Sequence, residues 1–490
     1  MATRLCIGAL IAGPGLMLLA GCSTSPFDYS SHQGPSGPHR LTVPQDSTSA
    51  PGSIYRDQER GALGSDQSQT TGGVVDSTPE SFVRYALYHN PEVERAYQQW
   101  RAASERLPQV RSLPDPRLSV GFFLDEVETR VGPQQAKVGL QQIFPWIGKL
   151  RDREDAAAKG ALAAWYQYQQ AQLEVVEQTQ IALYNLVYLD EATKITQENY
   201  ALLESFEAVV RARYRVGAGS HPELIKVQVE LGLLSDRLAG LEALRPSQVA
   251  GLNALLNRSP GASIEPGIRL ANSVAKGDAQ QAITLARVWS PVLQSIEERI
   301  ERARINTKLA QKERYPDLTA GIDYIVTDEA ANPGIAESGD DPIMLSFGIN
   351  LPIWSEKYDA QERESIAQRL SISRELDSAT NQLGAQIHQA WFEHTDADRR
   401  VRLYEDSLIP KAQESLSASL AGFRTGDSEF LDLLDTQRTL LEFGVSLQRA
   451  RADRGKALAT LNRLVGRPLG TTGEPAATNT INQIHDEELP

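Results

Sequence analysis

The most readily modified groups in this 490-residue chain are its two thiols, Cys6 and Cys22, which both lie near the start of the sequence. Cys22 follows Leu19-Ala20-Gly21, where small residues give a signal peptidase access to the backbone and the thiol is an acylation point. The apolar run 5–19 before it is too short and too interrupted by glycine and proline to span a membrane. We predict a lipoprotein signal at 1–21, which removes Cys6, and a covalent lipid on Cys22 as the only attached group. An ordinary signal with a chance cysteine is the alternative.

Two carboxylates near the end of the chain, Asp432 and Asp435, could attract cations. They are three residues apart, so they share one face of a helix. Around the axis of a symmetric assembly such acids would crowd, and their mutual repulsion would raise some of their pKa values. Two solvated surface acids are the alternative.

Enzymatic and metal chemistry find no support among the seven histidines. None belongs to a His-Glu-x-x-His pair, a Gly-x-Ser-x-Gly elbow or a phosphate loop. His388 and His394 are six residues apart, too far round a helix for an easy shared ligand site, and we expect them to be ordinary polar helix residues. The net charge of −14 argues against nucleic acid as a partner. We expect no enzyme, no bound metal and no cofactor beyond the lipid.

Two glycine-containing turns, at 215–220 and 424–428, each separate two long helical stretches. Glycine allows the left-handed conformation that a helix end requires, and Ser220 with Glu223 has the spacing of a capping box. We predict the tips of two helical hairpins here, with these tip residues: Gly217, Gly219, Ser220, Gly426, Asp427 and Ser428.

The body of the chain consists of two copies of one duplicated sequence unit. Pro114-Asp115 recurs 202 residues later as Pro316-Asp317, and the proline of Phe144-Pro145-Trp146 recurs 207 residues later in Leu351-Pro352-Ile353-Trp354. The offset grows along the chain to 209 residues, as expected after duplication and small insertions. We assign the following parts: signal 1–21, acylated extended segment 22–77, first repeat 78–258, linker 259–277, second repeat 278–467 and C-terminal tail 468–490.

Each repeat has the same predicted order of elements: a helix, two short strands, a very long helix and a returning helix. The predicted helices are 79–107, 148–214 and 222–256 in the first repeat, and 278–314, 356–423 and 429–465 in the second. Leucine and valine at alternating spacings of three and four from Leu224 to Leu241 indicate a coiled-coil seam. By its helices alone, the chain could equally be a long soluble bundle.

Four segments alternate between large apolar residues and small or polar ones: 117–124, 137–141, 318–326 and 344–351. This is the pattern of an outer-membrane barrel, which is apolar outside and wet inside. Four strands cannot close a barrel, so such a chain must assemble, with 8 strands in a dimer or 12 in a trimer. Two surface hairpins packed on helices are the alternative.

The lipobox, Asn90-Pro91-Glu92-Val93, Pro114-Asp115-Pro116, the run 144–149 (Phe-Pro-Trp-Ile-Gly-Lys), the glycine-tipped hairpins and the duplication together resemble the TolC family of outer-membrane efflux proteins. The resemblance covers about residues 78–468. It implies an α+β membrane protein: a homotrimer with a 12-stranded β-barrel in the outer membrane and a coiled-coil helical tunnel across the periplasm. It also implies two partners, a periplasmic adaptor protein and an inner-membrane pump, most simply of the RND type.

Carried over residue by residue, the resemblance implies that the two tips contact the adaptor and that Asp432 and Asp435 line a periplasmic gate, with Glu223 at a matching acidic position. In the member that gives the family its name, a tyrosine and an arginine tie the closed entrance shut. The matching positions here are Phe423 and Ser428, which lack the hydroxyl and the charge.

The implied function is a passive, gated export duct for small solutes, anchored by lipid in the outer membrane. Ser23 favours that location because an aspartate after the cysteine is the inner-membrane pattern. The run 144–149 leans the substrate towards metal cations. Export of organic compounds and a secretion duct for polypeptides share the same fold and stay open, as does a lipid-anchored periplasmic coiled-coil scaffold without a pore.

Overall fold

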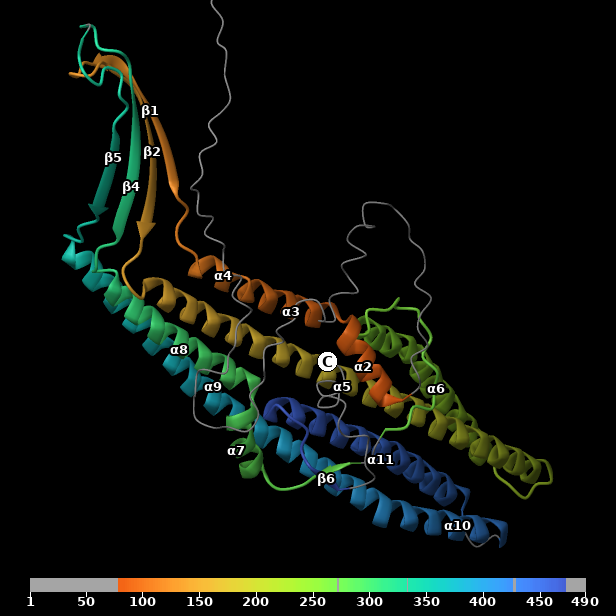
Figure 1. Ribbon diagram of the computed structural model, residues 1–490. Helices are drawn as coiled ribbons and strands as arrows, with labels where there is room; N and C mark the ends of the chain where they lie inside the picture. Colours follow the sequence, from red (N-terminus) through yellow and green to blue (C-terminus); the bar gives the residue numbers. More distant parts are fainter. Residues whose placement is uncertain (1–77, 271–272, 333, 426–428, 473–490) are drawn as a thin grey trace, which may run out of the picture. The chain divides into compact units, whose positions relative to one another are not determined.

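The computed structural model describes residues 78–270, 273–332, 334–425 and 429–472 (Figure 1). The predicted signal at 1–21, Cys22 and the rest of the segment 22–77 lie outside the described residues, as do Gly426, Asp427 and Ser428 of the second tip and the tail from 473 onward.

Helices make up most of the described chain. The first repeat contains α2 (Pro79–His89), α3 (Pro91–Ser104), α4 (Arg106–Arg111), α5 (Lys149–Arg215) and α6 (His221–Leu255). The second repeat contains α7 (Ala279–Trp289), α8 (Pro291–Lys312), α9 (Ser355–Leu403), a π-helical turn (Tyr404–Leu408), α10 (Ile409–Thr425) and α11 (Phe430–Val465). At 1.5 Å per residue, the uninterrupted α5 is about 100 Å long. No helix within the described ranges is both long and apolar enough to cross a membrane.

The prediction of a single first helix in each repeat was wrong. Breaks occur at Asn90 and Glu105 in the first repeat and at Ser290 in the second. Asn90 and Ser290 each precede a proline, and the proline ring disfavours helical backbone at the residue before it. The Asn90 side chain then accepts a hydrogen bond from the Glu92 backbone N–H at 2.8 Å, which caps α3.

The long helix predicted over 356–423 also departs from a regular α-helix, at the π-helical turn. Ile409 donates its backbone N–H to the carbonyl of Tyr404, five residues back. Pro410 follows at once and has no N–H to donate, so the regular hydrogen-bond ladder cannot continue unchanged through this point. The corresponding helix of the first repeat, α5, has no such turn.

The four predicted strands form one antiparallel sheet in the order β1 (Arg117–Val127), β2 (Gln134–Phe144), β4 (Leu318–Thr327) and β5 (Ile343–Ile349). The two repeats meet where β2 pairs with β4, and β1 and β5 are left as the edges. A small second ladder pairs β3 (Val274–Ala275) with β6 (Thr471–Thr472).

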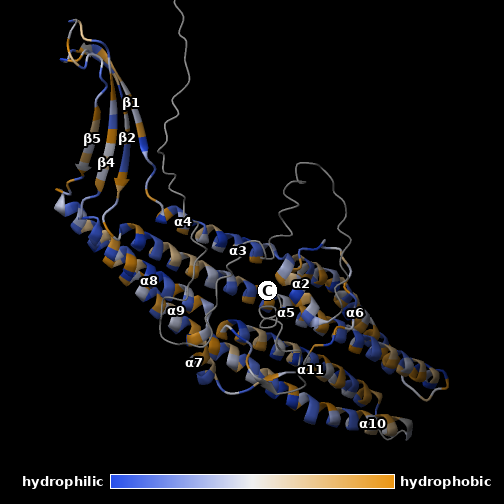
Figure 2. Cartoon of the chain, in the orientation of Figure 1, coloured by the Kyte–Doolittle hydropathy of each residue, from blue (hydrophilic) through white to orange (hydrophobic). Residues whose placement is uncertain are grey.

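One face of the four-stranded sheet is apolar across its full width. The register aligns Leu118, Leu140, Ile322 and Leu345 in one row and Val120, Val138, Tyr324 and Ile343 in the next. All eight side chains are exposed. Blue and orange alternate along these strands in Figure 2, as the pleat requires when one face is apolar and the other polar.

The opposite face of the sheet carries mostly small and polar residues, with a few large apolar ones such as Met344. Its row opposite Ser119 contains Gly139, Asp323 and Met344. Asp323 is buried there and pairs with the ammonium group of Lys137 at 3.3 Å. A Cβ atom on Gly139 would collide with the Asp323 carboxylate, so glycine is what leaves room for this acid.

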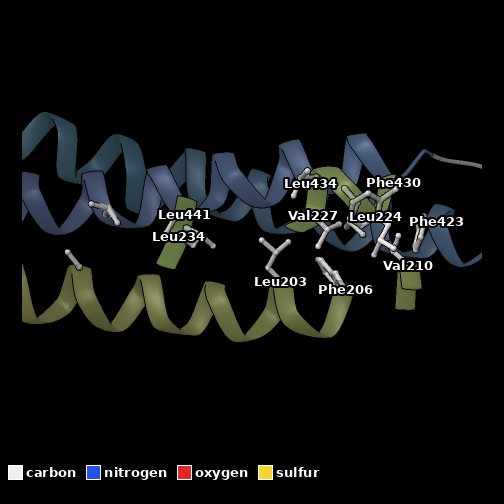
Figure 3. Packing of buried hydrophobic residues seen from close by; sticks show 13 residues of the cluster. Leu203, Phe206, Val210, Leu224, Val227, Leu234, Phe423, Phe430, Leu434 and Leu441 are labelled. Atoms are coloured by element: carbon white, nitrogen blue, oxygen red, sulfur yellow. The ribbon is translucent and has the colours of Figure 1, made fainter. Parts of the chain in front are cut away.

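The helical part is held by apolar clusters between the two repeats and within them. The largest lies near the hairpin tips, where α5, α6, α10 and α11 converge (Figure 3). The predicted seam of α6 contributes to it, since Leu224, Val227 and Leu234 are buried and Leu231 packs against them. Two further clusters join α2, α3, α5 and α6, and α7, α8, α9 and α11.

Candidate functional site

The first hairpin tip is built by its own backbone. Gly217 has a φ of 73°, which favours glycine, and Ala218 donates its N–H to the Arg213 carbonyl at 2.9 Å to close α5. The Ser220 hydroxyl accepts from the Glu223 N–H at 3.4 Å, and the Glu223 carboxylate accepts from the Ser220 N–H at 3.1 Å. The capping box predicted from the sequence is therefore present, and it engages Glu223 at the start of α6.

Asp432 and Asp435 lie together on an exposed face of α11, in its first and second turns. The neighbouring Phe430 and Leu433 are buried on the other side of the helix. Neither carboxylate accepts a hydrogen bond within the described part of the chain. One chain does not bring Glu223 to these acids as a cluster, because the described residues contain no group of three acids, histidines or cysteines that could hold a metal ion.

An ion pair between Glu230 of α6 and Arg438 of α11 joins the hairpins of the two repeats. The Arg438 Nε lies 3.3 Å from the Glu230 Oε1, and its Nη2 contacts the second oxygen. The hydrogen bond to Glu230, the charge of that carboxylate and the nearby Asp435 raise the pKa of Arg438. Sequence reasoning missed Glu230, although its place beside the apolar seam of α6 was a signal.

A second contact between the hairpins involves Phe423, at the position where the family pattern has a tyrosine. The Arg213 guanidinium of α5 lies 4.6 Å from the centre of the Phe423 ring and donates to the Phe423 carbonyl at 3.3 Å. The Phe423 ring also packs against Phe430, with 5.6 Å between ring centres (Figure 3). Arg213 and Phe423 thus join the two hairpins through a cation–π contact and a backbone hydrogen bond.

At the other end of the helices, Lys149 forms what we call the first joint between strands and helices. This fully buried ammonium group donates to Asp317 at 2.8 Å, to Glu313 at 3.3 Å and to the Tyr315 carbonyl at 3.1 Å. The rings of Trp146 and Tyr315 stack beside it, with 5.3 Å between their centres. The joint fastens the connection from β2 to α5 onto the connection from α8 to β4.

The charge of Lys149 sets the protonation of its partner. Burial by itself would raise the pKa of Asp317, but hydrogen bonds from Lys149 and from the Trp146 N–H lower it overall. Gly148, with a φ of 84°, makes the turn that places Lys149 at the first position of α5. The motif 144–149 therefore builds a joint, a role that its sequence did not reveal.

The expectation that His394 is an ordinary polar helix residue was wrong. Only 2% of it is exposed, and its Nε2 accepts the Ala275 backbone N–H at 3.0 Å. Nδ1 must then carry the proton and donate to the Arg454 carbonyl at 3.2 Å. Arg454 in turn pairs with Asp398 at 2.6 Å, so a buried polar network ties the linker between the repeats to α9 and α11. His388, by contrast, is exposed.

Known proteins with similar sequences and folds establish the family of this chain. The family profile described as "Outer membrane efflux protein" matches residues 83–258 and 282–467. The chain belongs to this family. Among curated relatives, the cobalt-zinc-cadmium resistance protein CzcC of Cupriavidus metallidurans is 22% identical over 401 residues, covering 80% of this chain and 90% of CzcC.

Solved structures agree on the fold. The outer membrane protein VceC of Vibrio cholerae has a TM-score of 0.66 at 18% identity and covers 80% of this chain and 97% of its own. CusC has a TM-score of 0.65 at 16% identity, with coverage of 83% and 96%. The predictions of a TolC-family efflux protein, of the fold class and of a non-enzymatic protein are confirmed. The chain is an outer-membrane efflux channel protein.

Proposed function

We propose that three copies of this chain form the outer-membrane duct of a tripartite efflux system. The observation that carries the proposal is the apolar face that runs across all four strands of a sheet with two open edges. Open edges are not tolerated in lipid, so the strands need further copies, and three copies supply twelve. The duct is passive, and an inner-membrane pump, most simply of the RND type, supplies energy through a periplasmic adaptor.

Conductance of the purified full-length chain in planar bilayers tests this function directly. We expect oligomers that resist dissociation in detergent and discrete single-channel steps. A protein that reaches the outer membrane but gives only monomers and no steps would overturn the proposal.

Asp432 and Asp435 are the proposed gate, and Glu223 of the first tip is its third proposed residue. Both aspartates are exposed on α11 beyond the hairpin tip, and three copies would place six carboxylates around one axis. Glu223 supports the gate from the first tip, where it caps α6 and fixes the start of that helix.

Replacing both gate carboxylates tests the gate. We expect Asp432→Asn with Asp435→Asn to lower cation selectivity and to raise the conductance of the closed state, because six negative charges and their repulsion are lost. Reversal potentials in asymmetric salt measure the selectivity. Glu94→Gln on α3 is the matched control. A double variant with unchanged selectivity and conductance would contradict the assignment of Asp432 and Asp435 to the gate.

The two hairpin tips are the proposed contact with the adaptor. Gly217, Gly219 and Ser220 form the first tip, and Gly426, Asp427 and Ser428 belong to the second. A photo-crosslinking residue at Ala218 should capture the adaptor hairpin in intact cells, while the same residue at exposed Arg374 of α9 should not. Equal capture at both positions would contradict a tip-specific contact.

Lipid on Cys22 is the proposed anchor, together with the outer-membrane lipid around the strands. Metabolic labelling with palmitate should mark the wild-type chain and not Cys22→Ser. Labelling of the serine variant would place the lipid elsewhere.

Metal cations are the proposed substrate class. CzcC is named for cobalt, zinc and cadmium resistance and aligns with 80% of this chain. Cells in which the gene for this protein is deleted should become more sensitive to these cations, and less so to organic toxicants. The reverse order would point to a duct for organic compounds.

A further inference from the structure

The first joint has a counterpart in the duplicated sequence that a single chain cannot complete. The first joint forms because β2 and β4 are neighbours, so that the end of one strand meets the start of the other. In the duplicated units, the end of β5 corresponds to the end of β2, and the start of β1 corresponds to the start of β4. The end of β5 and the start of β1 lie on opposite edges of the sheet, so they cannot meet within one chain. Three strand spacings of about 4.8 Å separate them by roughly 14 Å.

The internal repeat identifies the residues that lie at the end of β5 and before the start of β1. Residues 106–117 align without gaps with 308–319, and 144–149 align with 351–356. Each residue of the first joint therefore has a counterpart, and we call these counterparts the second joint: Ile353 for Trp146, Glu356 for Lys149, Arg111 for Glu313, Leu113 for Tyr315 and Asp115 for Asp317.

One of the two ion pairs that Lys149 makes in the joint, the pair with Glu313, is reversed in sign between the repeats. Lys149 and Glu313 are 3.3 Å apart in the first joint, and Glu356 and Arg111 take their places in the second. Glu356 is exposed and makes no hydrogen bond or ion pair within the described residues. The Arg111 side chain is 53% exposed, with a carboxylate of Glu154 3.9 Å away. Two changes of opposite sign at paired positions keep the two joints complementary.

The apolar pair of the joint follows the same logic. Trp146 and Tyr315 stack in the first joint, whereas their counterparts Ile353 and Leu113 are 68% and 45% exposed in one chain. Both are large aliphatic side chains at the ends of edge strands, where a neighbouring strand would cover them.

We propose that the second joint forms between copies, with Glu356 and Ile353 of one chain against Arg111 and Leu113 of the next. The inference rests on the ring of copies proposed above and assigns the residues that close it. Asp115, the counterpart of Asp317, brings a like charge towards Glu356, so Arg111 must serve two carboxylates. The joint between copies is therefore weaker than the first joint within each chain.

Thiol crosslinking tests the geometry, because the sequence has only Cys6 and Cys22. The double variant Ile353→Cys with Leu113→Cys should give covalent dimers and trimers after oxidation in membranes, while each single variant should not. The matched control, Trp146→Cys with Tyr315→Cys, should crosslink within one chain and keep the monomer mass. Failure of the first pair to link, in oligomers whose control pair does link, would overturn the second joint and leave the channel function standing.

Charge exchange tests the ion pair. Arg111→Glu should lower the temperature at which oligomers dissociate in detergent, because two acids then face each other across copies. Adding Glu356→Lys to Arg111→Glu copies the first joint and should restore that temperature to the wild-type value or above. Glu154→Gln, which removes the ion pair between Glu154 and Arg111, should leave the dissociation temperature unchanged. A double variant no more stable than Arg111→Glu would overturn the pairing. If the wild-type protein itself formed no oligomers and gave no conductance, the channel function would be overturned as well.

Discussion

Lys149 shows how much a single charge can depend on its surroundings. Its ammonium group is fully buried, and such a charge is tolerated only because Asp317, Glu313 and a carbonyl surround it. The motif 144–149, which contains Lys149, is recognisable from its similarity to 351–356 in the second repeat. The partners of Lys149 lie about 165 residues further along the chain.

We expect Lys149→Met to destabilise the protein by about 3–5 kcal/mol, because it leaves two carboxylates without their shared cation. Thermal unfolding followed by circular dichroism measures this. Arg151→Met, on an exposed residue two positions further along α5, is the control and should change stability little. Equal effects of the two variants would contradict the role of Lys149.

His394 makes stability depend on pH. Burial lowers its pKa from 6.5 and the charge of Arg454 adds to the effect, against the hydrogen bond to the Arg454 carbonyl and the charge of Asp398. The unfolded chain therefore binds a proton at a higher pH than the folded chain does. Stability contributed by neutral His394 is complete above about pH 6.5 and is lost as the pH falls towards the lowered pKa.

The variant His394→Gln should remove this component, since glutamine can accept from the Ala275 N–H and donate to the Arg454 carbonyl without titrating. Melting temperatures between pH 7.5 and 5 measure it. The wild type should lose more stability than the variant over this range, and parallel curves would show that another group is responsible. His388→Gln, at an exposed position, is the control.

At the scale of elements, close approach of α5 and α11 depends on a glycine. A Cβ atom on Gly455 of α11 would lie 2.1 Å from the ring of Tyr184 on α5. The two long helices, one from each repeat, can pack this closely only because that side chain is absent.

Gly455→Ala should therefore destabilise the protein by about 1–3 kcal/mol through overpacking. Gly251→Ala is the matched control, because a Cβ atom there meets nothing within 4 Å and alanine favours helix by about 0.5–1 kcal/mol. Chemical denaturation of both variants should give effects of opposite sign. A stabilised Gly455→Ala would mean that Tyr184 moves aside without cost.

At the scale of the whole molecule, the two faces of the sheet meet different surroundings. Phe347 on the apolar face is 83% exposed in one chain, and its neighbour Gly348 lies on the polar face. Lipid on the first side and water on the second would satisfy both.

Phe347→Arg should reduce the amount of protein inserted in the outer membrane, since a charge facing lipid costs about 2–4 kcal/mol at mid-depth. Gly348→Arg adds the same side chain to the other face and should insert more nearly as the wild type does, with altered conductance. Heat-modifiable migration of membrane fractions measures insertion. A reversed order of the two variants would mean that the faces are assigned the wrong way round.

Much of the fold could be predicted from the sequence, because its signals are local. Strand alternation has a period of two, the α6 seam a period close to three and a half, and the tip at Gly217 follows from turn chemistry. Pro91 and Pro291 were also local signals for helix breaks, but the predicted helices 79–107 and 278–314 ran through them. Asp432 and Asp435 could be placed on one helix face, whereas whether they meet other copies depends on assembly.

The sequence by itself determined the duplication, the apolar face of the sheet, the capped hairpin tip and the family. Only the tertiary structure decided the partners of the buried polar groups: Glu313 and Asp317 for Lys149, the linker for His394, and Arg438 for Glu230. The physical reason is distance along the chain. These partners are separated by 119 to 208 residues, and no local pattern records which helices pack together. The duplication adds one further expectation, because the residues of the first joint have counterparts at the two edge strands, β1 and β5, where we propose a second joint between copies.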